Sequence, residues 1–351
     1  MTILISLLGL IALVVIHELG HMLTAKALGV RVPEFGIGFG PALLKQKFGK
    51  TMYSFRVILL GGFAKMAGMN DDEVGPDTYP EKAAWRRALI IFAGPFANIL
   101  AAMLILTVIY VSGVPTDAEP EIEAVLPGSL AAEVGLQQGD DIVSIEGEPV
   151  QEWKDFQGVV GEKRPGDEVT LVVERNGERE VYSGTLQADP ENPERAIVGI
   201  RPVIDYTNYE PLEALWLGAK RTVQIIGLFG WFVGQLVTGD ISFYDSVSSP
   251  IAVVGVSSDV ATQGVQSFAQ FWAFISINLA VINLLPLLPL DGGHLFVIAA
   301  EKVLGRPVSA ETVNRIAAFG LALMFMIFLF STYTDLSKIF TGQPFITDQH
   351  P

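Results

Sequence analysis

The stretch His17-Glu18-Leu19-Gly20-His21 lies inside an apolar N-terminal run, and it decides the fold class. From Met1 to Ala25 the run contains a single carboxyl side chain, that of Glu18. An uncharged stretch of about 20 residues is long enough to cross the hydrocarbon core of a membrane. Ionisable groups at that depth are costly and usually functional. The stretch therefore predicts a membrane-spanning helix that carries a chemical site.

The spacing of the two histidines indicates a metal site. On a helix, His17 and His21 lie about 40° apart around the axis, so both imidazoles can reach one ion while Glu18 flanks them. This pattern is typical of zinc hydrolases, in which two histidines bind the metal and a glutamate is the general base. The alternative is a pair of core histidines bonded to neighbours on the helix. Uncompensated polar groups in hydrocarbon are unfavourable, which weighs against it.

Composition places much of the chain in lipid. Of its 351 residues, 50% are hydrophobic and 17% are charged, and the mean hydropathy is +0.43. A typical soluble domain has about 25% charged residues. The chain has no cysteine, which excludes disulfides and thiolate ligands.

The acidic residues are concentrated in one segment. Between Val114 and Glu213 lie 23 of the 38 acidic residues but only 7 of the 23 basic ones. One acidic soluble domain is therefore expected within an otherwise nearly neutral membrane body. An acidic exterior argues against a nucleic-acid partner, because phosphate binding needs basic patches.

Four segments have the length and composition of membrane spans. We expect the first to be retained, because it lacks a basic n-region and a small-residue cleavage site. A fifth apolar segment, Thr222 to Gly239, contains four glycines and two glutamines. It suits an amphipathic helix on the outer face better than a crossing. The four predicted spans are Ile3–Leu28, Ala88–Val114, Phe268–Leu290 and Ile316–Tyr333.

Basic residues predict the orientation of these spans. The connection from Arg31 to Arg87 carries nine lysines and arginines. By the positive-inside rule it faces the cytoplasm. The N-terminus and the acidic domain are then extracytoplasmic.

A catalytic zinc ion usually takes three protein ligands. Asp291, in Leu290-Asp291-Gly292-Gly293-His294, is the expected third ligand, since a carboxylate at membrane depth needs a cation. His294 could compete for this role, and otherwise caps the helix or supports the ligands.

Two asparagines precede this motif. Asn278 and Asn283 could form hydrogen bonds between helices or hold substrate carbonyls near the metal. Asn283 is the better candidate for a catalytic amide because it lies closer to Pro286 and Pro289. The prolines break helix regularity, and irregular backbone at that depth is tolerated only within protein or beside a water-filled cavity.

A candidate substrate-binding strand follows the first span. Residues 51–60 are apolar and rich in β-formers, and they end at a predicted turn at Gly61-Gly62. The segment could dip into the membrane and pair with an unwound substrate as an added strand. A structural hairpin that caps the cytoplasmic face is the alternative. The expected contacts are Arg56, Val57, Ile58, Leu59, Gly61 and Gly62.

These paired motifs resemble the site-2 protease family of intramembrane zinc metalloproteases. The order of parts is similar to that of the bacterial regulator-of-sigma-E protease type. The resemblance implies one zinc ion bound by His17, His21 and Asp291, with Glu18 as the catalytic base and Asn283 as a substrate contact. Further matching segments are Gly36–Pro41, Gly61-Gly62 and residues 93–98, where Gly94 and Asn98 are expected to permit close helix packing and an interhelical hydrogen bond.

The acidic segment resembles a protease-associated PDZ domain around residues 127–149. It is predicted to be mostly β, with strands at 122–125, 141–145, 169–174 and 179–186. The expected fold is a polytopic α-helical membrane protein with four transmembrane helices, a membrane-associated β-hairpin and this inserted PDZ-like extracytoplasmic domain. The predicted parts are 1–116, the membrane core's first half; 117–205, the PDZ-like domain; 206–262, interfacial amphipathic helices; and 263–351, its second half.

The expected activity is hydrolysis of a peptide bond in the transmembrane segment of a single-span protein. The resemblance implies a substrate such as an anti-sigma factor already trimmed by another protease, and a bacterial inner membrane location. The PDZ-like domain could bind a new C-terminus or act as a size filter. Clearance of remnant signal peptides is an alternative. The chain could instead be a metal-binding scaffold or a metal transporter. Neither function requires a glutamate beside the ligands, so the presence of Glu18 weighs against both.

Overall fold

The computed structural model describes residues 2–69, 73–190, 192–240, 250–262 and 264–341. The chain forms two compact units. One, here called the inserted domain, is Tyr110–Glu210. The other, here called the helical unit, combines Met1–Ile109 with Pro211–Pro351.

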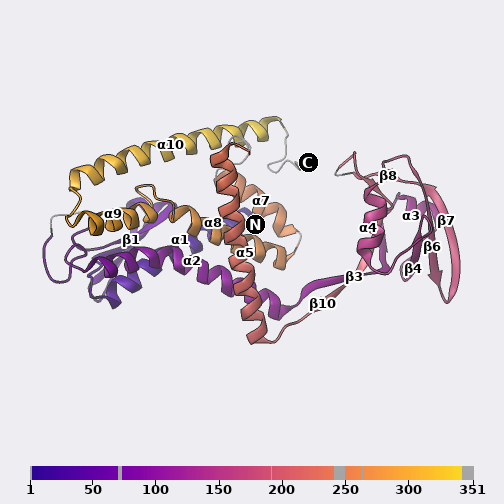
Figure 1. The fold of residues 1–351 in the computed structure, drawn as a ribbon, viewed down its shortest axis with the longest axis horizontal. Helices are drawn as coiled ribbons and strands as arrows, with labels where there is room; N and C mark the ends of the chain where they lie inside the picture. The colour runs from indigo at the N-terminus through magenta and orange to yellow at the C-terminus, as the bar shows by residue number, and fades with distance from the viewer. Residues whose placement is uncertain (1, 70–72, 191, 241–249, 263, 342–351) are drawn as a thin grey trace. The chain divides into compact units, whose positions relative to one another are not determined.

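The helical unit is built from long helices and one β-hairpin (Figure 1). Apolar composition over 19 or more residues explains the longest helices, because such segments satisfy their backbone internally and can face lipid on all sides. The elements in chain order are α1 (Thr2–Ala27), β1 (Glu34–Phe48), β2 (Thr51–Lys65), α2 (Ala84–Ser112), α5 (Pro211–Thr238), α7 (Pro250–Thr262), α8 (Val265–Asn283), α9 (Asp291–Leu304) and α10 (Ala310–Thr341).

Within the described residues, four helices are long and apolar enough to cross a membrane, as predicted. They are the segments Leu4–Ala27, Ala84–Ser112, Val265–Asn283 and Glu311–Lys338. The most apolar window of α2 is 44% buried and that of α10 is 11% buried, so α2 is central to the unit and α10 peripheral. α5 contains residues 222–238 of the fifth apolar segment and is not one of the four.

The predicted turn at Gly61-Gly62 is wrong. β1 and β2 are joined at Gly49-Lys50, where Phe48 pairs with Thr51, and β2 continues to Lys65. Both strands bend, so residues 34–37 pair with 52–55 on one side and with 62–65 on the other. Glycines permit the bends, since Gly38 and Gly61 have φ of 87° and 143°. The segment 61–65, here called the edge limb, therefore lies at one side of the sheet.

The predicted extent of the third span is also wrong at its C-terminal end. α8 ends at Asn283 rather than continuing to Leu290. The cause is the pair of prolines, which cannot donate backbone hydrogen bonds and restrict the residues before them. A turn with a cis bond at Leu288-Pro289 follows, and Asp291 then starts the separate helix α9.

The inserted domain is mostly β, as predicted. Its main sheet has six strands in the order β10-β3-β4-β6-β7, with β5 paired to β4. Three predicted strands lie within β3, β4 and β6, and the fourth overlaps β7 but extends one residue past its end at Thr185. Asn176-Gly177 joins β6 to β7 with φ of 53° and 82°, as a two-residue hairpin turn requires. The elements are β3 (Val114–Val125), α3 (Leu130–Val134), β4 (Asp141–Ile145), β5 (Glu148–Pro149), α4 (Trp153–Gly161), β6 (Glu168–Arg175), β7 (Glu178–Thr185), β8 (Gln187–Ala188), β9 (Ala196–Ile197) and β10 (Ile200–Thr207).

Alternating side chains give the inserted domain its own core. In β6, Val169, Leu171 and Val173 are at most 1% exposed, and residues between them face outward. They pack with Ile122 and Ile142 from the neighbouring strands. Phe156 and Val160 of α4 belong to the same core.

Candidate metal centre

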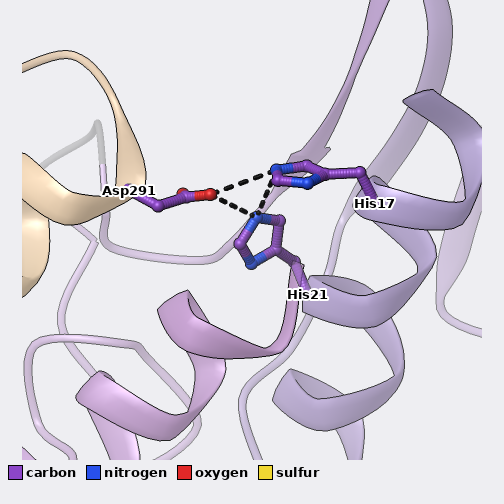
Figure 2. Close-up of side chains that lie close together, drawn as sticks. All are labelled: His17, His21 and Asp291. Carbon is purple, nitrogen blue, oxygen red and sulfur yellow. Dashed lines mark hydrogen bonds and ion pairs between the residues drawn. The ribbon is translucent and has the colours of Figure 1, made fainter. Parts of the chain in front are cut away.

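The structure brings together His17, His21 and Asp291 from opposite ends of the chain (Figure 2). Both imidazoles project from α1 towards the first turn of α9. The Nε2 atom of His17 lies 3.1 Å from Asp291 Oδ2, and that of His21 lies 3.4 Å from the same oxygen. The two Nε2 atoms are 3.2 Å apart. Three potential ligand atoms therefore form a nearly equilateral triangle.

The size of this triangle fits a tetrahedral zinc ion. Zinc bonds of about 2.0–2.1 Å at tetrahedral angles place neighbouring ligand atoms about 3.3–3.4 Å apart. The three measured edges are within a few tenths of an ångström of that value. A fourth position is left for water or substrate, as in catalytic zinc sites.

The hydrogen bonds around the triangle also fit a cation. The Nδ1 atom of His21 lies 2.9 Å from the Ile90 carbonyl oxygen, to which it donates. A neutral imidazole carries one N–H, so Nε2 of His21 then presents a lone pair. Asp291 Oδ2 is buried and has no hydrogen-bond donor among the described residues. Lone pairs that converge in a buried site favour a bound metal ion.

Glycines make room for the histidine-bearing helix. A Cβ atom at Gly94 in α2 would lie 2.2 Å from Nε2 of His21. A Cβ atom at Gly20 in α1 would lie 2.2 Å from the carbonyl oxygen of Ala93. The expected close packing of the two helices at Gly94 is present, and this glycine also leaves space for a candidate ligand.

α9 is held against the rest of the helical unit at both ends. At its start, Cβ atoms at Gly292 and Gly293 would clash with the backbone of the turn before it. Near its end, Glu301 accepts from Arg87 of α2 at 2.9 Å, and both side chains are largely buried. Because α2 also contacts His21, these contacts connect Asp291 with the histidines through one helix.

Glu18 faces the edge limb. A Cβ atom at Gly62 would lie 3.2 Å from Glu18 Cγ, so the Glu18 side chain lies against this segment. Glu18 is also adjacent in sequence to His17. The position places a carboxylate between the candidate metal ligands and a strand edge.

The other predicted site residues occupy different surroundings. His294 does not belong to the ligand group found among the described residues, so Asp291 rather than His294 is placed with the histidines. Asn283 ends α8, and its Nδ2 donates to the Leu279 carbonyl oxygen at 2.9 Å. Asn278 is half-buried on the same helix.

The predicted substrate contacts lie on both parts of the bent strand β2. Arg56 forms an ion pair with Glu34 at 2.7 Å and donates to the Gly40 carbonyl oxygen. Val57 and Ile58 are 53% and 50% exposed. Gly62 lies next to Glu18, because a Cβ atom added at this position would be 3.2 Å from Glu18 Cγ.

Some contributors to the site could not be identified from sequence. The Ile90 carbonyl acts through the backbone, so its side chain gives no signal. Arg87 and Glu301 were also missed as a pair, because 214 positions separate them.

Comparison with known proteins identifies the class. The model of peptidase family M50 matches residues 5–327, so the chain belongs to this family of site-2 proteases and is a peptidase. The sequence resemblance and the predicted enzyme class are therefore confirmed.

Relatives cover nearly the whole chain. A protein of Agrobacterium fabrum, provisionally named a zinc metalloprotease, is 33% identical over 93% of this chain and 93% of its own length. The zinc metalloprotease RasP of Geobacillus kaustophilus is 28% identical, over 94% and 96%. The regulator of sigma-W protease RasP of Bacillus subtilis is 28% identical, over 93% and 96%. The names of these relatives agree with the expectation of zinc.

A solved structure resembles a smaller part of the chain. The PDZ domain of the SdrC-like protein from Listeria monocytogenes is 26% identical and covers 26% of this chain and 92% of its own. The TM-score is 0.22, which is too low to establish a shared fold.

Proposed function

We propose that this chain is a zinc-dependent intramembrane endopeptidase with His17, His21 and Asp291 as the metal ligands. The observation that carries the proposal is the triangle of three ligand atoms with edges of 3.1–3.4 Å. It joins a candidate span, α1, to the start of α9. Family membership supplies the reaction class, and the geometry supports the assignment of residues.

The chemistry is hydrolysis of a peptide bond. A zinc ion held by the three ligands would supply a Lewis acid that activates water and polarises the carbonyl group. Glu18 takes a proton from the attacking water and later delivers it to the leaving amine. Asn283 remains a candidate for substrate contact, although its amide now bonds Leu279.

The edge limb is the proposed place for an unwound substrate. A peptide bond within a helix has its amides engaged, so the substrate must be extended before cleavage. Among the described residues the edge limb pairs with residues 34–37 on one side. Its other edge could receive a substrate strand, which would bring a peptide bond past Gly62 and towards Glu18.

The substrate class and topology follow from the same proposal. The substrate is the transmembrane segment of a single-span protein, such as an anti-sigma factor trimmed beforehand by another protease. The name of the sigma-W relative supports this class. The inserted domain faces the extracytoplasmic side of a bacterial inner membrane, where it acts as a size filter. Clearance of remnant signal peptides would use the same site. The membrane peptides that accumulate in cells with the Glu18→Gln variant would distinguish this substrate class from anti-sigma factors.

A metal transporter or scaffold is the rival reading. Neither needs a carboxylate that flanks the ligands and faces a strand edge, as Glu18 does. The position of Glu18 therefore favours the protease.

Two substitutions test the proposal on the purified full-length protein. Glu18→Gln should retain zinc and lose peptidase activity, because only the base is removed. Asp291→Ala should lose activity and bind zinc much more weakly. Loss of a residue that only hydrogen-bonds a metal ligand lowers zinc affinity by roughly 10- to 100-fold, and loss of the ligand itself should lower it by more. Zinc content and cleavage of a transmembrane peptide are measured together. Full activity of Glu18→Gln, or unchanged zinc affinity of Asp291→Ala, would contradict the assignment.

A further inference from the structure

Asn98 occupies the point where three helices of the helical unit meet. Its side chain lies in α2 and is fully buried. The amide Nδ2 is 3.5 Å from Nδ1 of His17 in α1. The backbone oxygen of Asn98 accepts a hydrogen bond from Ser276 Oγ of α8 at 2.8 Å. A buried amide at such a point needs a hydrogen-bond partner.

The proton of the His17 ring decides what this amide can do. This step rests on the proposed function, in which Nε2 of His17 binds the metal through a lone pair. A neutral imidazole has one N–H group, so the proton is on Nδ1. The Nδ1–H group therefore points towards Asn98 and needs an acceptor.

In this orientation the Asn98 amide turns its nitrogen, and not its oxygen, towards the His17 ring. Nδ2 of Asn98 is a donor, so two donors face each other across 3.5 Å. At the same time Oδ1 of Asn98 is buried without a donor among the described residues. Rotation of the amide by 180° exchanges the two atoms, which are assigned from their partners. The rotation removes the donor–donor contact and gives the Nδ1–H group of His17 an acceptor. The other end of the amide has no described partner in either orientation.

His21 already shows the same arrangement. Its Nδ1 donates to a carbonyl oxygen of α2, that of Ile90, at 2.9 Å. With Asn98 rotated, each histidine donates Nδ1–H to an oxygen on α2 and directs Nε2 towards Asp291. A metal-bound histidine usually donates its second N–H to such an oxygen, which fixes the ring and its tautomer.

We propose that Asn98 is a positioning residue whose amide oxygen accepts the Nδ1–H of His17. It holds the ring in the tautomer and orientation that metal binding requires. This role goes beyond helix packing, which any side chain of the same shape would provide.

The test compares variants by their zinc affinity, measured on the full-length protein by competition with a chelator. Asn98→Leu keeps the approximate shape but removes the acceptor, and should weaken zinc binding by about 10- to 100-fold. Asn98→Asp keeps an acceptor, and should bind zinc at least as tightly as the unmodified protein. Ser276→Ala is the matched control, since it removes the bond to the Asn98 backbone and should leave zinc affinity unchanged.

Each outcome separates this inference from the proposed function. Zinc affinity of Asn98→Leu equal to that of the unmodified protein would overturn it, and so would equal weakening in Asn98→Asp and Asn98→Leu. Circular dichroism checks folding, and Asn98→Ala replaces the leucine variant, with the same expectation, if that variant does not fold. By contrast, absence of zinc binding in the unmodified protein would refute the metal site itself.

Discussion

Two carboxylates with buried oxygen atoms, one in each unit, have opposite surroundings. Asp140 of the inserted domain is 1% exposed and accepts from Arg175 Nε at 2.6 Å, from Arg175 Nη2 at 2.7 Å and from the Gln137 amide at 2.8 Å. Asp291 Oδ2 faces two imidazole nitrogens and has no described donor. Burial of a carboxylate is therefore not a functional signal by itself. The missing donors distinguish a candidate ligand from a structural ion pair.

The surroundings of the two residues extend the contrast. The inserted domain has the pattern of a protein in water, with Ile122 and Leu171 buried and charges outside. The helical unit exposes large apolar side chains, such as Phe319 at 69% and Phe325 at 58%. Polar residues are buried at its candidate site instead. Such exposed apolar surface suits lipid, and the buried polar groups then indicate function.

The largest expected effect concerns the structural ion pair. Arg175→Met leaves the buried Asp140 carboxylate without its cation, and should destabilise the inserted domain far more than the loss of an exposed ion pair does. Arg179→Met is the control, because the Arg179–Glu174 pair is exposed and such pairs contribute about 0–1 kcal/mol. Hydrogen exchange of β4 and β6 in the full-length protein measures the difference. Zinc content should not change, and a loss of zinc in Arg175→Met would break the distinction between the two carboxylates.

A smaller effect is expected at the cradle of the metal centre. Gly94→Ala places a Cβ atom where His21 Nε2 now lies 2.2 Å away, so the ring must shift by about 1 Å. A displacement of this size can lower turnover by about 100-fold. Peptidase turnover and zinc affinity are the measurements.

The matched control for this change is Gly227→Ala. Gly227 is also helical, but in the part of the chain that the structure describes no atom beyond its own stretch of helix lies within 4 Å of the position that its Cβ would occupy. Its activity should equal that of the unmodified protein. Equal activity of the two alanine variants would show that Gly94 does not shape the site.

Sequence predicted those parts of the fold that depend on local pattern. Apolar runs located four spans, and alternation located strands such as β6, because burial in each follows from the spacing of side chains. The end of α8 was missed, since the apolar run continues past Asn283 and only the prolines mark the break. The path of β2 was also missed, because Gly61 serves a bend instead of a turn.

The candidate site was predictable in its residue types but not in its supports. The sequence indicates the ligands because ionisable residues are costly in hydrocarbon and are usually functional there. These residues are two histidines at helical spacing and an aspartate at the end of an apolar run. The choice between Asp291 and His294 needed the start of α9, which sets the direction of each side chain. The acceptor for the His21 Nδ1–H group is the backbone oxygen of Ile90, which a pattern of side chains cannot predict.

The smallest expected effect concerns the pH dependence of the stability of the inserted domain. Its slope at acidic pH should have opposite signs in the unmodified protein and in Arg175→Met. Burial raises the pKa of Asp140, whereas the hydrogen bonds from Arg175 and from the Gln137 amide lower it. The lowering is the larger effect, so the pKa of Asp140 in the folded domain is below its ordinary value of 3.8. The unfolded chain then binds the proton more readily than the folded one. The stabilisation is present above pH 3.8 and is lost as pH falls through the lower, folded pKa.

Removal of the arginine should reverse this slope. In Arg175→Met burial is the largest remaining influence, so the pKa of Asp140 rises above its ordinary value. Protonation then favours the folded domain, and acidification from neutral pH should recover part of the stability that the variant lost. Hydrogen exchange of β4 at a series of pH values, corrected for the intrinsic exchange rate, measures both slopes. Parallel pH profiles in the two proteins would mean that Arg175 does not control the charge of Asp140, and the contrast with Asp291 would then need another cause.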